Sequence, residues 1–198
     1  MYFDGALNLE GAGPGVLLIS PRANQLKYVL QIHYTASNNG AEYEALIHGL
    51  RIAISLGIRR LMCYGDSSVV INQVNKEWDT RKETMDAYCA EIHKLEAQFY
   101  SLEIQFVPRE RNVAADVLSK LGSKRAMVPA GVFVQDLRKP SIKILEKVGD
   151  PPIEAADADP PARNELMIIE GDWRAPILAF ILEQKSYPDR KQHEKLVR

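Results

Sequence analysis

Short apolar runs separated by turn residues predict three consecutive strands in the first part of the chain. The runs cover residues 1–3, 16–20 and 26–32, and the connections include Asp4-Gly5 and the segment from Pro21 to Gln25. Such close spacing is typical of an antiparallel meander. Because Asp-Gly is a common turn pair, we expect the first strand to be short and to end at Asp4.

The pattern then changes to the helical period. After Asn38 and Asn39, apolar or small residues recur at 45, 46, 49, 50, 53 and 54, and Gly57 provides a helix stop. The later pattern predicts a strand over 61–64, helices over 67–78 and 83–99, a strand over 102–107 and a helix over 112–121. Helices that connect strands favour parallel pairing. The expected fold class is therefore α/β, with a mixed five-stranded sheet flanked by helices.

Proline marks a change of character near Gly122. Eight of the 11 prolines follow this residue, and residues 149–163 are both polar and rich in proline. Such a composition is typical of linkers, because it cannot bury a core. We expect a folded domain over 1–122, a proline-rich linker over 123–170 and a short helical tail over 171–198, so that the C-terminal extension is largely irregular.

Composition narrows the class of protein without identifying it. No stretch approaches the roughly 18 apolar residues that a membrane span needs, and the two cysteines are too few for a disulfide framework. We therefore expect a soluble intracellular protein with no membrane partner. Residues 1–122 hold 12 basic and 14 acidic side chains, so charge alone does not indicate a nucleic-acid binder.

Three aspartates occupy positions that a metal site could use. Asp4 and Asp66 each follow a predicted strand, where ligands of α/β sheets gather, and Asp116 lies at the edge of the apolar stripe of the last helix. Each has a simpler explanation: Asp4 could form a turn, Asp66 could cap the helix that begins at Ser67, and Asp116 could be an ordinary exposed acid. The pattern alone leaves these alternatives open.

Glu42 is more informative because of its position on the long helix. At about 100° per residue it shares the apolar side with Leu46 and Ala53, whereas Glu44 falls on the opposite, solvent side. A carboxylate that points into a protein is costly unless it is paired or binds a metal. The alternative is a capping box with Asn39 at the N-cap and Glu42 three residues later, which the pattern does not exclude.

Taken together, the four acids indicate more than any one of them. Two acids that follow strands and two on helices can converge on one point, and carboxylate oxygens suit Mg²⁺ or Mn²⁺. Two such ions can activate a water and stabilise the leaving oxygen of a phosphodiester.

Five motifs resemble those of type 1 ribonuclease H in content and in order. They are Tyr2-Phe3-Asp4-Gly5-Ala6, Gly11 to Gly15 at the start of the second strand, Ser37 to Ala45, Tyr64-Gly65-Asp66-Ser67, and Pro108 to Asp116. The last motif is similar to the archaeal-like branch, which also occurs in plant Ty3/gypsy-like retrotransposon polyproteins.

The resemblance implies a nuclease that cuts the RNA strand of an RNA–DNA hybrid. It implies that Asp4, Glu42, Asp66 and Asp116 are catalytic and ligate two Mg²⁺ ions, with Mn²⁺ as a possible substitute. It further implies that Asn38 and Asn39 read the minor groove of the hybrid, where the RNA 2′-OH is exposed. Ser67, Arg109 and Asn112 are the other expected substrate-binding residues.

The chain departs from the family pattern in two places, and its tail carries a further resemblance. The first strand begins only three residues before Asp4, and the loop before Asp116 has Arg109 and Arg111 where bacterial members carry a histidine. The short strand leaves open an alternative, a non-catalytic nucleic-acid-binding retroelement remnant with the same fold. Residues 172–178 resemble the stretch between ribonuclease H and integrase in such polyproteins, so reverse transcriptase and integrase domains are expected partners.

Overall fold

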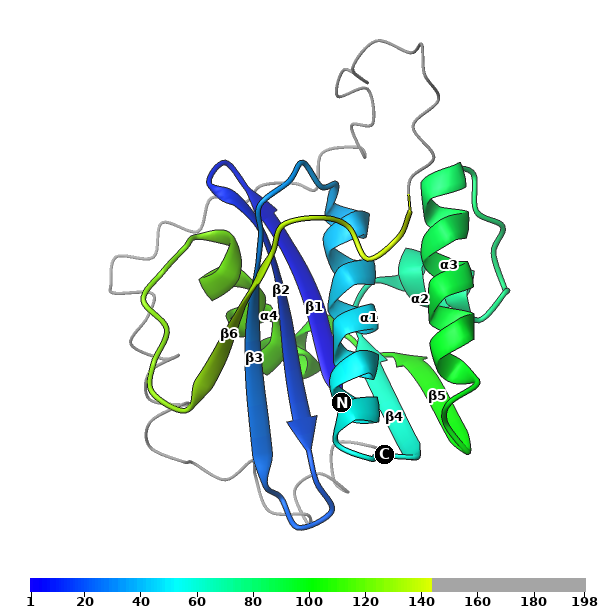
Figure 1. Cartoon of the computed structure of the whole chain (residues 1–198), viewed down its shortest axis with the longest axis horizontal. Helices are drawn as coiled ribbons and strands as arrows, with labels where there is room; N and C mark the ends of the chain where they lie inside the picture. The colour runs from blue at the N-terminus through cyan, green and yellow to red at the C-terminus, as the bar shows by residue number, and fades with distance from the viewer. Residues whose placement is uncertain (144–198) are drawn as a thin grey trace, which may run out of the picture. The chain divides into compact units, whose positions relative to one another are not determined.

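A mixed six-stranded sheet with helices on both faces forms the folded part of the chain (Figure 1). The computed structural model describes residues 1–143. Its elements, in chain order, are β1 Tyr2–Asn8, β2 Gly11–Ile19, β3 Gln25–Ile32, α1 Asn38–Ser55, β4 Arg60–Gly65, α2 Ser68–Val74, α3 Glu83–Glu96, β5 Ser101–Phe106, the 3₁₀ turn η1 Arg109–Arg111, α4 Val113–Ser123 and β6 Val132–Leu137. The predicted α/β class and mixed sheet are confirmed.

The strand order is β5-β4-β1-β2-β3-β6. Strands β1, β2 and β3 form the predicted antiparallel meander, whereas β4 pairs parallel to β1 and β5 parallel to β4. None of the described helices is both long and apolar enough to cross a bilayer.

The prediction that the first strand ends at Asp4 is wrong. Strand β1 continues to Asn8, and Asp4 lies within it, paired with Gly15 of β2. The turn comes later, where the Asn8 side chain accepts hydrogen bonds from the backbone N–H groups of Glu10 and Gly11. Gly5 serves close packing instead of a turn, because a Cβ on it would lie 2.3 Å from the backbone nitrogen of Glu42.

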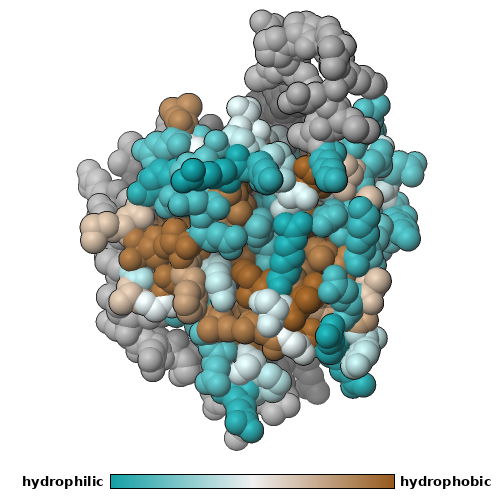
Figure 2. Space-filling view, in the orientation of Figure 1, coloured by the Kyte–Doolittle hydropathy of each residue, from teal (hydrophilic) through white to brown (hydrophobic). Residues whose placement is uncertain are grey.

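The sixth strand lies in the segment predicted to be linker. Strand β6 pairs parallel to β3, and Phe133 stacks on Tyr28 with ring centroids 5.0 Å apart. Figure 2 shows apolar residues gathered on one face of the molecule. Phe133 is 53% exposed. Because β6 is short and mostly exposed, it carries little of the apolar periodicity that predicts strands.

The compact unit of the chain extends from Met1 to Ile144, beyond the predicted boundary at 122. Leu137 and Ile142, which follow that boundary, are buried in its core. The predicted linker beyond residue 143 and the helical tail over 171–198 lie outside the described residues.

Helix α1 is buried on more than one side. It packs on β1 and β2 of the sheet and also contacts α3 (Figure 1). The ring of Tyr43 in α1 stacks on that of Tyr88 in α3, with centroids 5.1 Å apart. The prediction that Glu44 faces solvent is therefore wrong, since its exposed fraction is 0%. Burial opposes ionisation of Glu44, but hydrogen bonds with His48, Ser141 and Tyr34 lower its pKa to about 2.

Candidate metal centre

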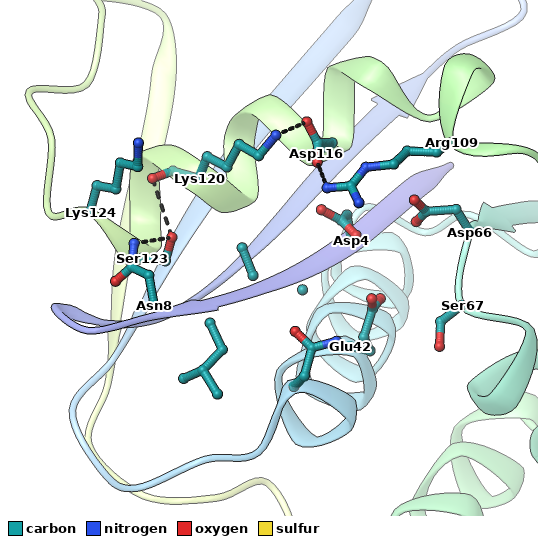
Figure 3. Close-up of a pocket in the computed structure, with 14 residues that line it drawn as sticks. Asp4, Asn8, Glu42, Asp66, Ser67, Arg109, Asp116, Lys120, Ser123 and Lys124 are labelled. Atoms are coloured by element: carbon teal, nitrogen blue, oxygen red, sulfur yellow. Dashed lines mark hydrogen bonds and ion pairs between the residues drawn. The ribbon is translucent and has the colours of Figure 1, made fainter. Parts of the chain in front are cut away.

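Three carboxylates from three different elements meet at one point. Asp4 comes from β1, Glu42 from the first turns of α1 and Asp66 from the residue directly after β4, and one oxygen of each lies within 4.8 Å of the others (Figure 3). Asp4 and Glu42 are buried, with 5% of each residue exposed, and Asp66 is half-buried. We refer to these three residues as the carboxylate cluster.

Glycines bring α4 against the sheet beside this cluster. A Cβ on Gly15 would lie 2.4 Å from the backbone nitrogen of Ser119, and one on Gly13 would lie 2.1 Å from that of Ser123. Because these two strand residues have no side chain, the α4 backbone can approach β2 closely. This approach allows the Ser119 hydroxyl to donate a hydrogen bond of 2.6 Å to Oδ2 of Asp4.

The cluster concentrates negative charge in a place that disfavours it. The pKa of Asp4 is raised to about 7, chiefly by burial and also by the charges of the neighbouring Asp66 and Asp116, while the Ser119 hydrogen bond opposes this shift. The pKa of Glu42 is raised well above its ordinary value. Burial is the largest cause, and the charges of Asp4 and Asp66 add to it. Oε2 of Glu42 is buried and accepts no hydrogen bond from the described residues. A divalent cation with oxygen ligands would relieve both the repulsion and the missing partner, so the residues fit such an ion.

Asp116 lies beside the cluster but is held by cations of the protein. Arg109 Nη2 lies 2.8 Å from its Oδ1 and Lys120 Nζ lies 2.7 Å from its Oδ2. The hydrogen bond with Asp116 is also the largest cause that raises the pKa of Arg109. The structure therefore brings together three of the four predicted ligands and places the fourth in a double ion pair.

The alternative capping roles of Asn39 and Asp66 are wrong. Ser37 is the N-cap of α1 and accepts a hydrogen bond of 3.1 Å from the backbone N–H of Gly40. Ser67 is the N-cap of α2 and accepts one of 3.4 Å from Val70. Glu42 therefore belongs to no capping box, and Asp66 is left to face the cluster.

The predicted substrate-binding residues occupy three different settings. Asn38, Ser67 and Arg109 line the cleft that contains the carboxylate cluster, whereas Asn39 is not among its lining residues. Asn112 is fully buried, and its amide donates hydrogen bonds to the Phe3 carbonyl (2.9 Å) and to Oδ1 of Asp66 (2.8 Å). Asn112 therefore supports Asp66 from beneath the surface of the cleft.

Sequence reasoning missed the basic end of the cleft. The cleft has a volume of about 410 Å³ and continues from the carboxylates to Asn8, Lys120, Ser123 and Lys124 (Figure 3). The Asn8 amide donates a hydrogen bond of 3.2 Å to the Ser123 hydroxyl. The spacing of the two lysines at four and eight residues after Asp116 was the available signal, because such residues share one side of a helix.

A model of the reverse transcriptase-like family matches residues 2–122. The chain belongs to this family. Its match contains all three residues of the carboxylate cluster and also Asp116, but it ends before β6.

Three relatives of this reverse transcriptase-like chain match different shares of its length. Ribonuclease HI of Halobacterium salinarum is 33% identical over 120 residues, which cover 60% of each chain. A putative hydrolase, EbsB of Enterococcus faecalis, is 29% identical over 127 residues, which cover 61% of this chain and 90% of that protein. The bifunctional protein Rv2228c of Mycobacterium tuberculosis is 34% identical over 84 residues, and this chain spans 23% of its length.

Solved structures show the same fold. Ribonuclease H1 from Halobacterium salinarum superposes with a TM-score of 0.57 at 31% identity, covering 63% of this chain and 96% of that one. LC11 ribonuclease H1 in complex with an RNA/DNA hybrid superposes with a TM-score of 0.56 at 25% identity, covering 63% and 95%. The resemblance to a type 1 ribonuclease H domain is thus confirmed for the described part of the chain.

Proposed function

We propose that this chain is a divalent-cation-dependent endonuclease that cuts the RNA strand of RNA–DNA hybrids. The observation that carries the proposal is the carboxylate cluster, with its unpartnered Glu42 oxygen, in a fold shared with ribonuclease H1. The complex of the LC11 enzyme with an RNA/DNA hybrid supports the choice of substrate.

Asp4, Glu42 and Asp66 would hold one cation, and Asp4 with Asp116 would hold a second. Mg²⁺ is the expected ion and Mn²⁺ a substitute, because both prefer oxygen ligands. When bound, a pair of such ions would supply an activated water for in-line attack and charge stabilisation for the leaving oxygen. Occupation of the second position requires Asp116 to exchange at least one of its partners, Arg109 or Lys120.

The protein's own groups keep the ligands in place. Asn112 fixes Asp66 through a hydrogen bond, and Ser119 fixes Asp4 from α4. Such supporting hydrogen bonds orient ligands and limit their motion.

The cleft would receive the nucleic acid along its length. Asn38 and Ser67 line it beside the cluster and would contact the hybrid, and Lys120 and Lys124 would attract its phosphates. Asn39, next to Asn38 at the start of α1, is the remaining predicted contact. Recognition would depend on shape, backbone and the RNA 2′-OH, with little reading of bases.

A cleavage assay tests the proposal. The wild-type chain and an Asp66→Asn variant, both checked for folding by circular dichroism, are incubated with Mg²⁺ and a hybrid labelled on each strand. We expect only the wild type to cut, and only the RNA strand, with duplex DNA as the matched control substrate. Binding of the hybrid without cleavage would instead favour the non-catalytic retroelement remnant.

The expected reverse transcriptase and integrase partners remain predictions, since residues 172–178 lie outside the described residues.

A further inference from the structure

Glu44 connects four parts of the molecule through one carboxylate. Its Oε1 accepts hydrogen bonds from the hydroxyls of Tyr34 (2.8 Å) and Tyr88 (3.0 Å) and from the backbone N–H of Ser141 (2.8 Å). These partners come from the loop after β3, from α3 and from the segment after β6. We refer to Glu44 and these three partners as the Glu44 anchor.

The anchor fastens the segment of residues 138–142, which passes in front of α1 (Figure 1). The Ser141 hydroxyl accepts a hydrogen bond of 2.9 Å from Arg51 and lies 3.2 Å from Nε2 of His48. The next residue, Ile142, is buried in the core. The segment is therefore attached to α1 by polar contacts at Ser141 and by apolar burial directly after it.

The anchor lies across α1 from the carboxylate cluster. Glu42 and Glu44 are two residues apart and so point to opposite sides of the helix. On the cluster side, the β1 backbone at Gly5 lies against the α1 backbone at Ala41 and Glu42, where not even a Cβ would fit. The first turns of α1 are thus held between β1 on one side and the Glu44 anchor on the other.

We propose that Glu44 is a positioning residue for the cluster, which holds the start of α1 so that Glu42 stays within reach of Asp4 and Asp66. The inference rests on the proposed function, because it assigns Glu44 a role in the same metal site. It also extends the functional unit from the family match at 2–122 to residue 142, since Ser141 is part of the anchor.

The test compares full-length variants that differ in whether they keep the anchor. Glu44→Leu removes the acceptor, whereas Glu44→Gln keeps an acceptor of the same shape. Ser141→Pro removes the backbone donor, and Ser141→Ala removes only the hydroxyl. Asp136→Asn is the control, because it breaks the exposed His33–Asp136 pair (2.7 Å) on β6 without touching Glu44. Each folded variant is titrated with Mn²⁺ in a calorimeter, and hydrogen exchange is measured at the amides of residues 38–43 without metal.

We expect Glu44→Leu and Ser141→Pro to weaken Mn²⁺ binding about tenfold, as the loss of outer support for a metal ligand does. Both variants should also speed hydrogen exchange at the amides of residues 38–43. If Glu44→Leu does not fold, Ser141→Pro provides the test by itself. Glu44→Gln, Ser141→Ala and Asp136→Asn should stay within about threefold of the wild-type affinity.

Two results would overturn the inference. Lower melting temperatures with unchanged Mn²⁺ affinity and unchanged exchange at residues 38–43 would reduce Glu44 to a structural residue and leave the proposed function standing. A wild-type chain that binds no Mn²⁺ would remove the metal site itself, and with it both proposals. A chain that binds Mn²⁺ but cuts no hybrid would contradict only the nuclease, because the positioning of Glu42 would still be measured.

Discussion

Helix α1 carries two buried carboxylates in opposite electrostatic situations. Glu42, on the side of the carboxylate cluster, has an oxygen without a hydrogen-bond partner and a pKa raised well above its ordinary value. Glu44, on the other side, also has one oxygen without a hydrogen-bond partner, Oε2, which lies 3.5 Å from Nε2 of His48. Its Oε1, however, accepts three hydrogen bonds, and the pKa of Glu44 is lowered to about 2. Both residues are almost fully buried, at 5% and 0% exposure.

The difference shows that burial alone does not identify a metal ligand. A buried carboxylate whose charge is met by several protein donors is a structural group, whereas one that lies among other carboxylates still requires a cation. Asp116 is intermediate, because Arg109 and Lys120 already meet its charge.

The largest expected effect is on catalysis. Glu42→Gln should lower the rate of hybrid cleavage about a thousandfold, because it removes a ligand charge that protein groups do not replace. Glu44→Gln should lower the rate by about threefold or less, because the amide oxygen still accepts the same hydrogen bonds. Single-turnover cleavage with saturating Mg²⁺ measures both. Equal losses in the two variants would show that the two sides of α1 do not differ in function.

The same pair of positions should respond in the opposite order when stability is measured. Glu44→Leu leaves three donors unpaired and should cost about 3–5 kcal/mol of unfolding free energy. Glu42→Leu should cost little or even stabilise the metal-free protein, since it removes a buried charge without a partner. Urea unfolding in the presence of EDTA gives both values. A larger loss for Glu42→Leu would contradict the comparison.

The pH dependence of stability should separate the two sides as well. The pKa of Asp4 is raised from 3.8 to about 7. The contribution of Asp4 to the free energy of unfolding is therefore complete below pH 3.8 and is lost as the pH rises through about 7. The pKa of Glu44 is lowered from 4.5 to about 2. The stabilising contribution of Glu44 is therefore present above pH 4.5 and is lost as the pH falls through about 2.

In EDTA we therefore expect the wild-type protein to lose about 2–4 kcal/mol between pH 5 and pH 8. Asp4→Asn should flatten this slope, and a saturating divalent cation at pH 8 should restore the lost stability. Unfolding curves at several pH values provide the measurement. A wild-type protein whose stability does not fall over this range would contradict the raised pKa of Asp4.

The smallest effect concerns the support of a ligand. Ser119→Ala removes the 2.6 Å hydrogen bond to Asp4 and should slow cleavage about fivefold, which corresponds to about 1 kcal/mol. Ser55→Ala is the control, because the Ser55 hydroxyl donates to the Ile52 carbonyl at the end of α1 and lines no part of the cleft. Equal rates for the two variants would remove Ser119 from the account.

The sequence alone predicts a helix or strand correctly where one side of that element is buried and the other is exposed. The antiparallel meander and α1 have such patterns, and helix phase correctly directed Glu42 toward the protein interior. It was not sufficient where burial comes from tertiary packing. The helical pattern predicts that Glu44 faces solvent, because the local sequence does not indicate that α3 and residues 138–142 cover that side of α1.

Other misses have the same kind of cause. Strand β6 is too exposed to show a periodic pattern, and its place depends on pairing with β3, far away in the sequence. Asp4-Gly5 has the composition of a turn, but Gly5 is required by the approach of α1. The burial of Asn112 beneath Asp66 follows from the packing of α4, which no local pattern specifies.

The most direct test of the central claim is to locate the cation. Crystals of the full chain grown with Mn²⁺ should show an anomalous difference peak within coordination distance of Asp4, Glu42 and Asp66, and no peak near Glu44. The Glu42→Gln variant should lose that peak under the same conditions. A wild-type crystal with saturating Mn²⁺ and no peak among these three carboxylates would contradict the account.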